Sequence, residues 1–498
     1  MTNTSTQSTR WGITLTAVCA ITALAPLTPP ASAHERSSRV VVMEDAGAGS
    51  GPERAVQGLG GRIDREIPII NGFSARMPRS AVRALRGTPG VRSVNRDRRF
   101  KLRSTVDAPV APSTTLDTLR GAVGAETVSG GPVDVALIDS GVSPDAALAG
   151  HVVDGPDFSE DAGADELRNL DAFGHGTHLA GIIAAVAPQA RVVNVKVADH
   201  EGSTSLSRLL AGIDWTVRRG DRDGLNVRVL NLAFGAEVDG SYRSDPLAFA
   251  AERAWDKGVT VVVSAGNGGA EAVTLDSPAY DPYVIAVGAE DSGGTATLAD
   301  DGMAPFSSRG SITRSPDVVA PGVAIVSTRV PGSFLDEAFP AARIGDGFRG
   351  SGTSQAAAVV SGAAALVLGS RSRLDPDAVK ALLRSTARPL TSTDTSLQGA
   401  GVVNVLAAVG SAVPANARQR FLEARIGGWM RGALRNQYAV ENPQSNRWSS
   451  NRWSSNRWSS NRWSSNRWSS NRWSSNRWSS NRWSSNRWSS VEWGGGSE

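Results

Sequence analysis

The stretch "VDVALIDSG", residues 133–141, is a nearly continuous apolar run that ends in a carboxylate, a hydroxyl and a glycine. A strand with one face in water alternates polar and apolar residues, whereas this run is apolar on both faces. Strands of that kind are expected in a parallel sheet that helices cover on each side. Four later runs share the pattern: "ARVVNVKV" (190–197), "VRVLNLAF" (227–234), "VTVVVSAG" (259–266) and "YVIAVGA" (283–289).

Helical patterns alternate with these runs: "HGTHLAGIIAAVA" (175–187), "LSRLLAGIDWTVRRG" (206–220), "DPLAFAAERAWDKG" (245–258) and "LDPDAVKALLRSTA" (374–387). This alternation predicts a three-layer α/β fold with a mostly parallel sheet between helices, which we assign to residues 114–412. Ligands in such sheets bind at the carboxyl ends of the strands. The polar residues that end the apolar runs are therefore the candidates for chemistry.

The N-terminal segment predicts export. In residues 1–33, Arg10 precedes an apolar stretch and the segment ends in "ASA", a signal-peptidase pattern. Lipid anchoring at Cys19 is the alternative, but the bulky Val18 before it argues against that interpretation. Because Cys19 is the single cysteine, no internal disulfide can form. The Ala/Val run after Ser354 is too short for a membrane span, so we expect a secreted, extracellular or cell-envelope-associated protein, and a monomer.

The basic character of the chain lies in its tail. The formal net charge is +4, and nine copies of "NRWSS" in residues 446–490 contribute nine Arg, so the remainder carries −5. We therefore expect no nucleic-acid partner. A five-residue step rotates each Trp by about 140° on a helix and alternates faces on a strand, so neither forms one apolar stripe. Two interpretations stay open: Arg–Trp pairs that bind an anionic envelope surface, or a tolerated low-complexity tail.

Residues 39–103 form a separate compositional unit. Its patterns follow the order β-α-β-β-α-β, which predicts a small α+β module of ferredoxin-like topology. Prolines and small polar residues make residues 104–113 a linker. Residues 413–445 are expected to connect the large α/β domain to the repeats.

Three polar residues stand at informative places: Asp139 ends an apolar run, and His175 and Ser354 each begin a helical pattern. Each has a plain structural reading. Asp139 could cap a turn or sense a dinucleotide, although no G-x-G-x-x-G follows a strand in the right place. His175 with His178 could be a metal pair, and Ser354 could be a helix N-cap. Together they fit nucleophilic acyl transfer, in which a carboxylate supports an imidazole that deprotonates a serine.

Four motifs occur in a set order: "ALIDSGV" (136–142), "GHGTHLAG" (174–181), "SAGNGG" (264–269) and "GTSQAAA" (352–358). Over roughly residues 114–412 the chain resembles the subtilisin-like serine proteases. The resemblance implies that Asp139 orients the imidazole of His175. It also implies that His175 acts as general base and then general acid, and that Ser354 attacks the scissile carbonyl.

Further roles follow from the same resemblance. Asn267 matches the asparagine that donates to the oxyanion, together with the backbone N–H of Ser354. Two segments match the strands that pair with substrate backbone by β-augmentation. These segments contain Ala233, Phe234 and Gly235 on one side, and Gly202 and Ser203 on the other.

The module at 39–103 resembles the inhibitory propeptide of this family in "NGFSARMP" (71–78) and "PGVRSVNRD" (89–97). That likeness implies a folding assistant and intramolecular inhibitor whose last strand occupies the active site. Self-cleavage is then expected within residues 100–110.

Two departures from the family pattern concern the residues after the serine and the metal sites. Where the family often has Met-Ala-Ser-Pro-His, this chain has Gln355, Ala356, Ala357, Ala358 and Val359. The chain also runs from His175 to the next strand without the inserted loop that binds calcium in many relatives. We expect no cofactor for the chemistry and predict no calcium site. The carboxylates of the acidic stretch "DFSEDAGADE" (157–166) could bind a structural calcium ion, but we favour a solvated acidic loop.

The sequence thus predicts a secreted serine endopeptidase that acts on protein or peptide substrates and matures by processing its own propeptide. The alternative is a catalytically weak protease scaffold that binds the cell envelope through its repeat tail.

Overall fold

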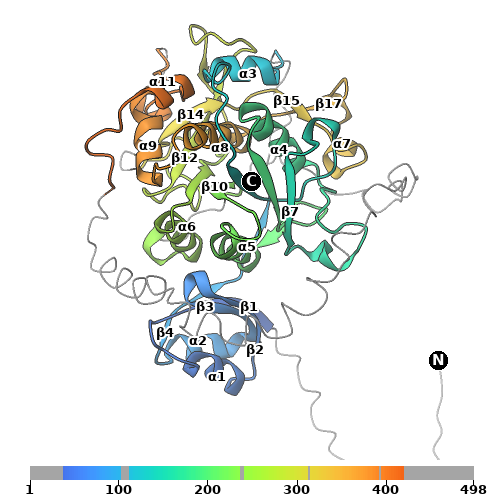
Figure 1. Cartoon of the computed structure of the whole chain (residues 1–498). Helices are drawn as coiled ribbons and strands as arrows, with labels where there is room; N and C mark the ends of the chain where they lie inside the picture. The colour runs from blue at the N-terminus through green and yellow to red at the C-terminus, as the bar shows by residue number, and fades with distance from the viewer. Residues whose placement is uncertain (1–36, 103–111, 236–240, 312–313, 392–393, 420–498) are drawn as a thin grey trace, which may run out of the picture.

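The computed structural model describes residues 37–102, 112–235, 241–311, 314–391 and 394–419 (Figure 1). The signal peptide expected at 1–33 and the repeat tail at 446–490 lie outside these residues. So do most of the linker at 104–113 and most of the connector at 413–445. The expectations for those segments remain predictions.

The body of the protein is built on one large sheet, in which the strand order is β13-β12-β11-β10-β6-β8-β7 and β14 also pairs with β12. Every pairing among these described strands is parallel except that of β12 with β13. The mostly parallel sheet is therefore confirmed. The strands are β6 (Asp134–Asp139), β7 (Val152–Asp157), β8 (Arg191–Lys196), β10 (Val227–Leu232), β11 (Thr260–Ser264), β12 (Ile285–Asp291), β13 (Gly302–Met303) and β14 (Val318–Pro321).

Helices cover both faces of this sheet, as Figure 1 shows. On one side α4 (His175–Val186) packs against α8 (Thr353–Ser370), and on the other α5 (Leu206–Arg219) packs against α6 (Pro246–Asp256). The predicted three-layer α/β fold is confirmed. The shorter helices are α3 (Leu116–Ala122), α7 (Phe334–Ala338), α9 (Pro376–Ser385), α10 (Thr395–Gln398) and α11 (Val405–Gly410).

Helix α8 is longer than the sequence suggested. Its 18 residues are long and apolar enough to cross a membrane by length and composition, and 89% of them are buried inside the protein. The prediction that this run is too short was wrong, because small residues continue the helix through Gly362. A Cβ at Gly362 would lie 2.7 Å from Cβ of Val186 in α4. The glycine therefore permits the close approach of two core helices.

The N-terminal residues form a second, smaller sheet with its own core. Its four antiparallel strands have the order β2-β3-β1-β4. The buried side chains include Val42, Phe73 and Leu85. Along the chain the elements are β1 (Ser37–Glu44), α1 (Gly51–Gly58), β2 (Arg62–Ile67), β3 (Gly72–Pro78), α2 (Val82–Arg86) and β4 (Val91–Arg96).

Several contacts join this N-terminal module to the body. The short 3₁₀ turn Pro68–Ile70 packs on α5 and α6, where the backbone N–H of Ile69 donates to the carboxylate of Asp214 at 2.9 Å. In Figure 1 the module lies directly beneath these helices. Strand β5 (Arg99–Lys101) then pairs antiparallel with β9 (Ser203–Ser205) of the body.

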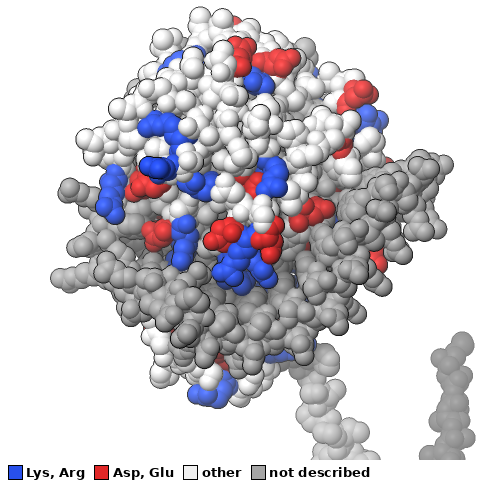
Figure 2. Space-filling model, in the orientation of Figure 1, with Lys and Arg blue, Asp and Glu red and all other residues white. Residues whose placement is uncertain are grey.

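Another small antiparallel sheet lies beside α4. It contains β15 (Ile325–Thr328), β16 (Arg343–Ile344) and β17 (Gly347–Gly350), and β15 packs on α4. On the face drawn in Figure 2, positive and negative side chains of the described residues lie next to one another.

Candidate active site

The four polar residues singled out from the sequence lie at or near the ends of strands and helices. Asp139 is the last residue of β6, His175 the first of α4 and Ser354 the second of α8. Asn267 follows the end of β11 by three residues. The side chains of Asp139, His175 and Ser354 are each 1–2% exposed. Parallel strands end at one edge of a sheet, so residues far apart in sequence share this edge.

Asp139 and His175 are in direct contact. Nδ1 of His175 lies 2.8 Å from Oδ1 of Asp139, and the same oxygen accepts from the backbone N–H of Ser140 at 2.8 Å. Nε2 of His175 has no hydrogen-bond partner in the described part of the chain. The carboxylate thus holds one ring nitrogen and leaves the other uncommitted.

The electrostatics of this pair favour a charged imidazole. Burial lowers the pKa of His175, but the charge and hydrogen bond of Asp139 and the charge of Asp171 outweigh it. The pKa of His175 is therefore raised above its ordinary value of 6.5. A nearby carboxylate stabilises the protonated ring, so His175 can hold a proton in transit.

Asp171 is a support that the sequence analysis missed. Its fully buried carboxylate accepts from the backbone N–H groups of Gly174 and Thr177, each at 2.7 Å, and lies 2.8 Å from Oγ of Ser140. It therefore ties the first turn of α4 to the residue after Asp139. Its position four residues before His175, in "DAFGHGT", is the signal that could have identified it.

Ser354 does not cap its helix. The N-cap of α8 is Gly352, which has no side-chain oxygen, and Ser354 lies inside the first turn. Its Oγ donates to the backbone carbonyl of Ala233 at 3.2 Å, across 121 positions of the chain. The helix begins here, so its free N–H groups and the positive end of its dipole lie beside this hydroxyl.

Asn267 is anchored next to the serine. Its side-chain oxygen accepts from the backbone N–H of Thr353 at 3.0 Å and from the Thr353 hydroxyl at 2.9 Å. A backbone N–H can only donate, so the atom it meets is the oxygen of the amide. A Cβ placed on Gly352 would lie 3.4 Å from Nδ2 of Asn267. The NH₂ group therefore lies beside the backbone that precedes Ser354.

The glycines around His175 allow close approach. Gly174 adopts a φ of 103°, which side chains of L-residues rarely tolerate. A Cβ at Gly176 would lie 3.2 Å from the Asp139 side chain and would also overlap the carbonyl of Gly141. Larger residues at these positions would push α4 away from β6.

The two segments expected to pair with substrate belong to different elements. Ala233, Phe234 and Gly235 directly follow β10, and both Ala233 and Phe234 are buried. Gly202 and Ser203 stand at the start of β9, and the carbonyl of Gly202 accepts from the backbone N–H of Leu102 at 2.9 Å. This second edge is thus occupied by the chain's own residues after β5.

His178 lies three residues after His175 in the same helix, α4. It is buried. Burial is the larger cause that lowers the pKa of His178 to about 3, and the charge of His175 acts in the same direction. Its ring packs edge-on against Phe348. In the part of the chain that the structure describes, no group of three or more His, Cys, Asp or Glu side chains is placed to hold a metal ion.

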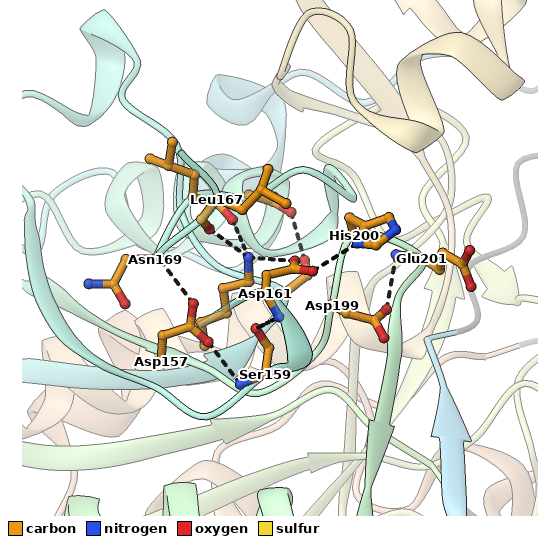
Figure 3. Close-up of polar contacts among 12 residues, drawn as sticks. Asp157, Ser159, Asp161, Leu167, Asn169, Asp199, His200 and Glu201 are labelled. Carbon is orange, nitrogen blue, oxygen red and sulfur yellow. Dashed lines mark hydrogen bonds and ion pairs between the residues drawn. The ribbon is translucent and has the colours of Figure 1, made fainter. Parts of the chain in front are cut away.

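The acidic stretch at 157–166 is only partly the solvated loop that we expected, because Glu160, Asp165 and Glu166 are exposed but the other two carboxylates are not. Asp157 and Asp161 are 8% and 4% exposed. Asp157 accepts from the backbone N–H groups of Ser159 and Asn169, and Asp161 contacts His200 (Figure 3). For these two carboxylates the expectation was wrong, because Asp157 binds nearby backbone donors and Asp161 binds Lys196 and His200 from a later segment.

Comparison with known proteins finds a matching family model and several similar proteases. The model of the subtilase family matches residues 130–406. Serine protease AprX of Bacillus subtilis is 33% identical over 354 residues, which cover 67% of this chain and 78% of that protein. Subtilisin E of the same species is 32% identical over 365 residues, covering 70% and 83%.

A solved structure of a related enzyme is also similar to this chain. Fervidolysin from Fervidobacterium pennivorans, described as a keratinolytic enzyme related to subtilisin, superposes with a TM-score of 0.60 at 26% identity. The match covers 76% of this chain and 62% of the fervidolysin chain. The protein therefore has a subtilisin-like fold, belongs to the subtilase family and is a serine-type endopeptidase.

Proposed function

We propose that this chain hydrolyses peptide bonds through an acyl-enzyme, with Ser354 as nucleophile, His175 as proton carrier and Asp139 as orienting carboxylate. The observation that carries the proposal is the 2.8 Å contact between His175 and Asp139, in which both side chains are 1% exposed. A buried carboxylate in this position keeps the proton on Nδ1 of the imidazole, so Nε2 can accept another.

The chemistry requires Oγ of Ser354 to leave the carbonyl of Ala233 and contact Nε2 of His175. Catalytic hydrogen bonds are often loose before substrate binds. As Nε2 takes the hydroxyl proton, Oγ bonds to the scissile carbonyl carbon and the carbonyl oxygen becomes an oxyanion. Nε2 then returns the proton to the leaving amine, and the C–N bond breaks. Water repeats the sequence against the acyl ester and releases the acid and Ser354.

We assign oxyanion stabilisation to Nδ2 of Asn267 and the backbone N–H of Ser354. Thr353 supports this assignment because it holds the amide oxygen of Asn267 and thereby orients the NH₂ group. The N-terminus of α8 adds fixed positive potential beside the developing charge. The chain's own residues supply every part of this reaction, and no cofactor is needed in it.

The N-terminal module acts, in this proposal, as an inhibitory propeptide. Strand β5 pairs with β9 in the antiparallel manner of a bound extended peptide, and Leu102 continues that pairing to Gly202. Phe100 and Leu102 are 7% and 2% exposed in this arrangement. Such a segment would exclude other substrates until the chain is cleaved within residues 100–110.

The setting that we propose is outside the cell, because residues 1–33 have the pattern of a signal peptide. The Arg and Trp residues of 446–490 favour retention on an anionic envelope surface.

The test uses a phosphonyl fluoride probe, which labels an activated serine. We expect the mature protein to be labelled and Ser354→Ala to be unlabelled. Ser361→Ala is the matched control, because Ser361 is a buried serine of the same helix whose Oγ bonds to Asn231. Absence of label on the mature wild type would favour the alternative, a weak scaffold that binds the envelope.

The same Ser354→Ala variant reports on maturation. Produced without other proteases, it should remain as an unprocessed precursor on a gel, whereas Ser361→Ala should mature. Normal processing of Ser354→Ala would overturn the self-cleavage part of the proposal.

A further inference from the structure

The carboxylate of Asp161 lies between two basic side chains from different elements. It stands in the 3₁₀ turn Glu160–Gly163. Its Oδ2 is 2.9 Å from Nζ of Lys196, and its Oδ1 is 2.8 Å from Nδ1 of His200. Figure 3 shows the second contact, with Asp199 and Glu201 beside His200. Nothing in the proposed chemistry uses these groups.

Lys196 anchors one side of this arrangement. Its side chain is fully buried, and Nζ also donates to the backbone carbonyls of Leu167 at 2.9 Å and Leu170 at 2.8 Å. A buried ammonium is costly unless it is paired and hydrogen-bonded. The segment from Asp161 to Leu170 is therefore held around this charge.

The anchor is next to the proposed catalytic carboxylate. Lys196 is the last residue of β8 and pairs in register with Asp139 of β6. The backbone N–H groups of Val197 and Ala198 both donate to the carbonyl of Asp139, at 2.8 and 3.2 Å. The chain that leaves β8 therefore starts from a fixed point before it reaches the substrate edge.

His200 lies on the loop that joins β8 to that edge. Oδ1 of Asp199 accepts from the backbone N–H groups of Glu201 at 3.0 Å and Ser203 at 2.9 Å. The N–H of Gly202 donates to the Asp199 carbonyl at 2.9 Å. The loop is thus a compact unit, and the contact between His200 and Asp161 attaches it to the turn at Glu160–Gly163.

We propose that Asp161 and His200 are positioning residues for extended substrates, because they hold the loop that sets the register of the Gly202–Ser205 edge. The inference rests on the proposed function, in which this edge pairs with substrate backbone. A peptide that reaches the edge would depend on the attachment. A substrate that occupies only the catalytic centre would not.

Protonation of His200 strengthens the attachment. The groups that face it are Asp161 from the 3₁₀ turn and Asp199 and Glu201 from its own loop, with Lys196 on the far oxygen of Asp161. The hydrogen bond to Asp161 raises the pKa of His200 above 6.5, against the opposing effect of burial. The ionic attraction between His200 and Asp161 is fully present when the pH lies below the ordinary histidine pKa. It is lost as the pH rises through the raised pKa of His200.

The experiment compares two chromogenic peptide amides that share the leaving group and the residue attached to it. One substrate contains only that residue, and the other contains four residues. For His200→Ala we expect KM of the four-residue substrate to rise about 2- to 5-fold, the range for a partly exposed ion pair. Its kcat, and both constants for the single-residue substrate, should stay unchanged.

Two further variants complete the design. His200→Asn keeps an N–H donor near the position of Nδ1 and removes the titration. In the wild type, the ratio of KM for the four-residue substrate to KM for the single-residue substrate should rise as the pH rises through the raised pKa of His200. His200→Asn should restore most of the affinity and abolish that rise. His151→Ala is the matched control, since the ring of this half-buried histidine lies 3.3 Å from the carbonyl of Ala190, at the other end of β8 from the edge.

The outcomes separate the two proposals. If the wild type cleaves neither amide, the proposed function fails. If the wild type cleaves both and His200→Ala leaves the KM ratio and its pH dependence unchanged, the positioning role of His200 is wrong. An equal rise in KM for both substrates would also overturn it, because that result points to a general structural effect.

Discussion

The protein contains two aspartate–histidine pairs with the same contact and different surroundings. In Asp139–His175 and in Asp161–His200, the distance from Nδ1 to the carboxylate is 2.8 Å. Both side chains of the first pair are 1% exposed, whereas His200 is 39% exposed. In both pairs the aspartate raises the histidine pKa. The contact alone therefore does not distinguish a catalytic pair from a positioning pair.

The difference lies in what else the carboxylate meets. Asp161 already compensates the buried ammonium of Lys196. Apart from His175, the carboxylate of Asp139 accepts from the neutral backbone and hydroxyl groups of Ser140. The negative charge of Asp139 is thus available to an imidazolium that forms during a reaction. The charge of Asp161 is divided between two permanent structural partners.

The largest expected difference concerns the histidines. His175→Ala should lower kcat by about 10⁶, the size measured for the equivalent loss in subtilisin, because it removes the group that we propose deprotonates Ser354. His200→Ala should leave kcat unchanged. Steady-state kinetics on one peptide amide, with circular dichroism to confirm folding, measure both. A loss of kcat below about 10² in His175→Ala would make the two pairs equivalent and contradict the comparison.

A smaller effect is expected at the carboxylate. Asp139→Asn should lower kcat by about 10⁴ at neutral pH with little change in KM, because the amide favours the wrong tautomer of His175. A variant that kept wild-type kcat and its pH profile would remove Asp139 from the proposed triad. The thermal unfolding midpoint serves as control, since the effect should appear in the rate rather than in the folded fraction.

The smallest effect is expected at Asp161, the carboxylate beside Lys196. The protein contains a second buried lysine–aspartate pair that serves as a matched comparison. Lys380 is also buried and contacts the carbonyls of Pro282 and Val284 and the carboxylate of Asp317. Asp161→Asn and Asp317→Asn should each lower the free energy of unfolding by about 3–5 kcal/mol, because each leaves a buried ammonium without its counter-charge. Urea denaturation measures this change.

Only Asp161→Asn should also raise KM for a four-residue substrate, because in the described part of the chain the carboxylate of Asp317 contacts Ala286, Arg314 and Lys380 and not the edge loop. If both variants raised KM equally, loss of stability would explain the effect. The special relation of Asp161 to the substrate edge would then be disproved.

Much of the fold was predictable because the pattern that encodes it is local. Runs such as residues 133–141 are apolar on both faces, and they became the buried strands of the sheet. The end of one run placed Asp139 at the edge of the sheet, and the structure brings the first residue of α4, His175, into contact with it there. The β-strands and helices of the body follow from periodicities of two and 3.6 residues that are readable without tertiary information.

The burial of carboxylates in the acidic segment could not be predicted from such local patterns. By composition, residues 157–166 are polar and charged, which favours a solvated loop. Asp161 is buried because Lys196, 35 positions later, and His200, 39 positions later, fold back onto it. No local pattern records that meeting, because ion pairs depend on which strands become neighbours.

The sequence alone determined the layered α/β architecture, the polar residues at the strand and helix ends, and their likeness to a protease family. The tertiary structure decided which carboxylate meets which cation, and that the hydroxyl of Ser354 turns to the carbonyl of Ala233 rather than capping its own helix. The reason is physical. Secondary structure follows side-chain periodicity along a few turns, whereas pairing and burial depend on contacts between segments that the chain brings together only when it folds.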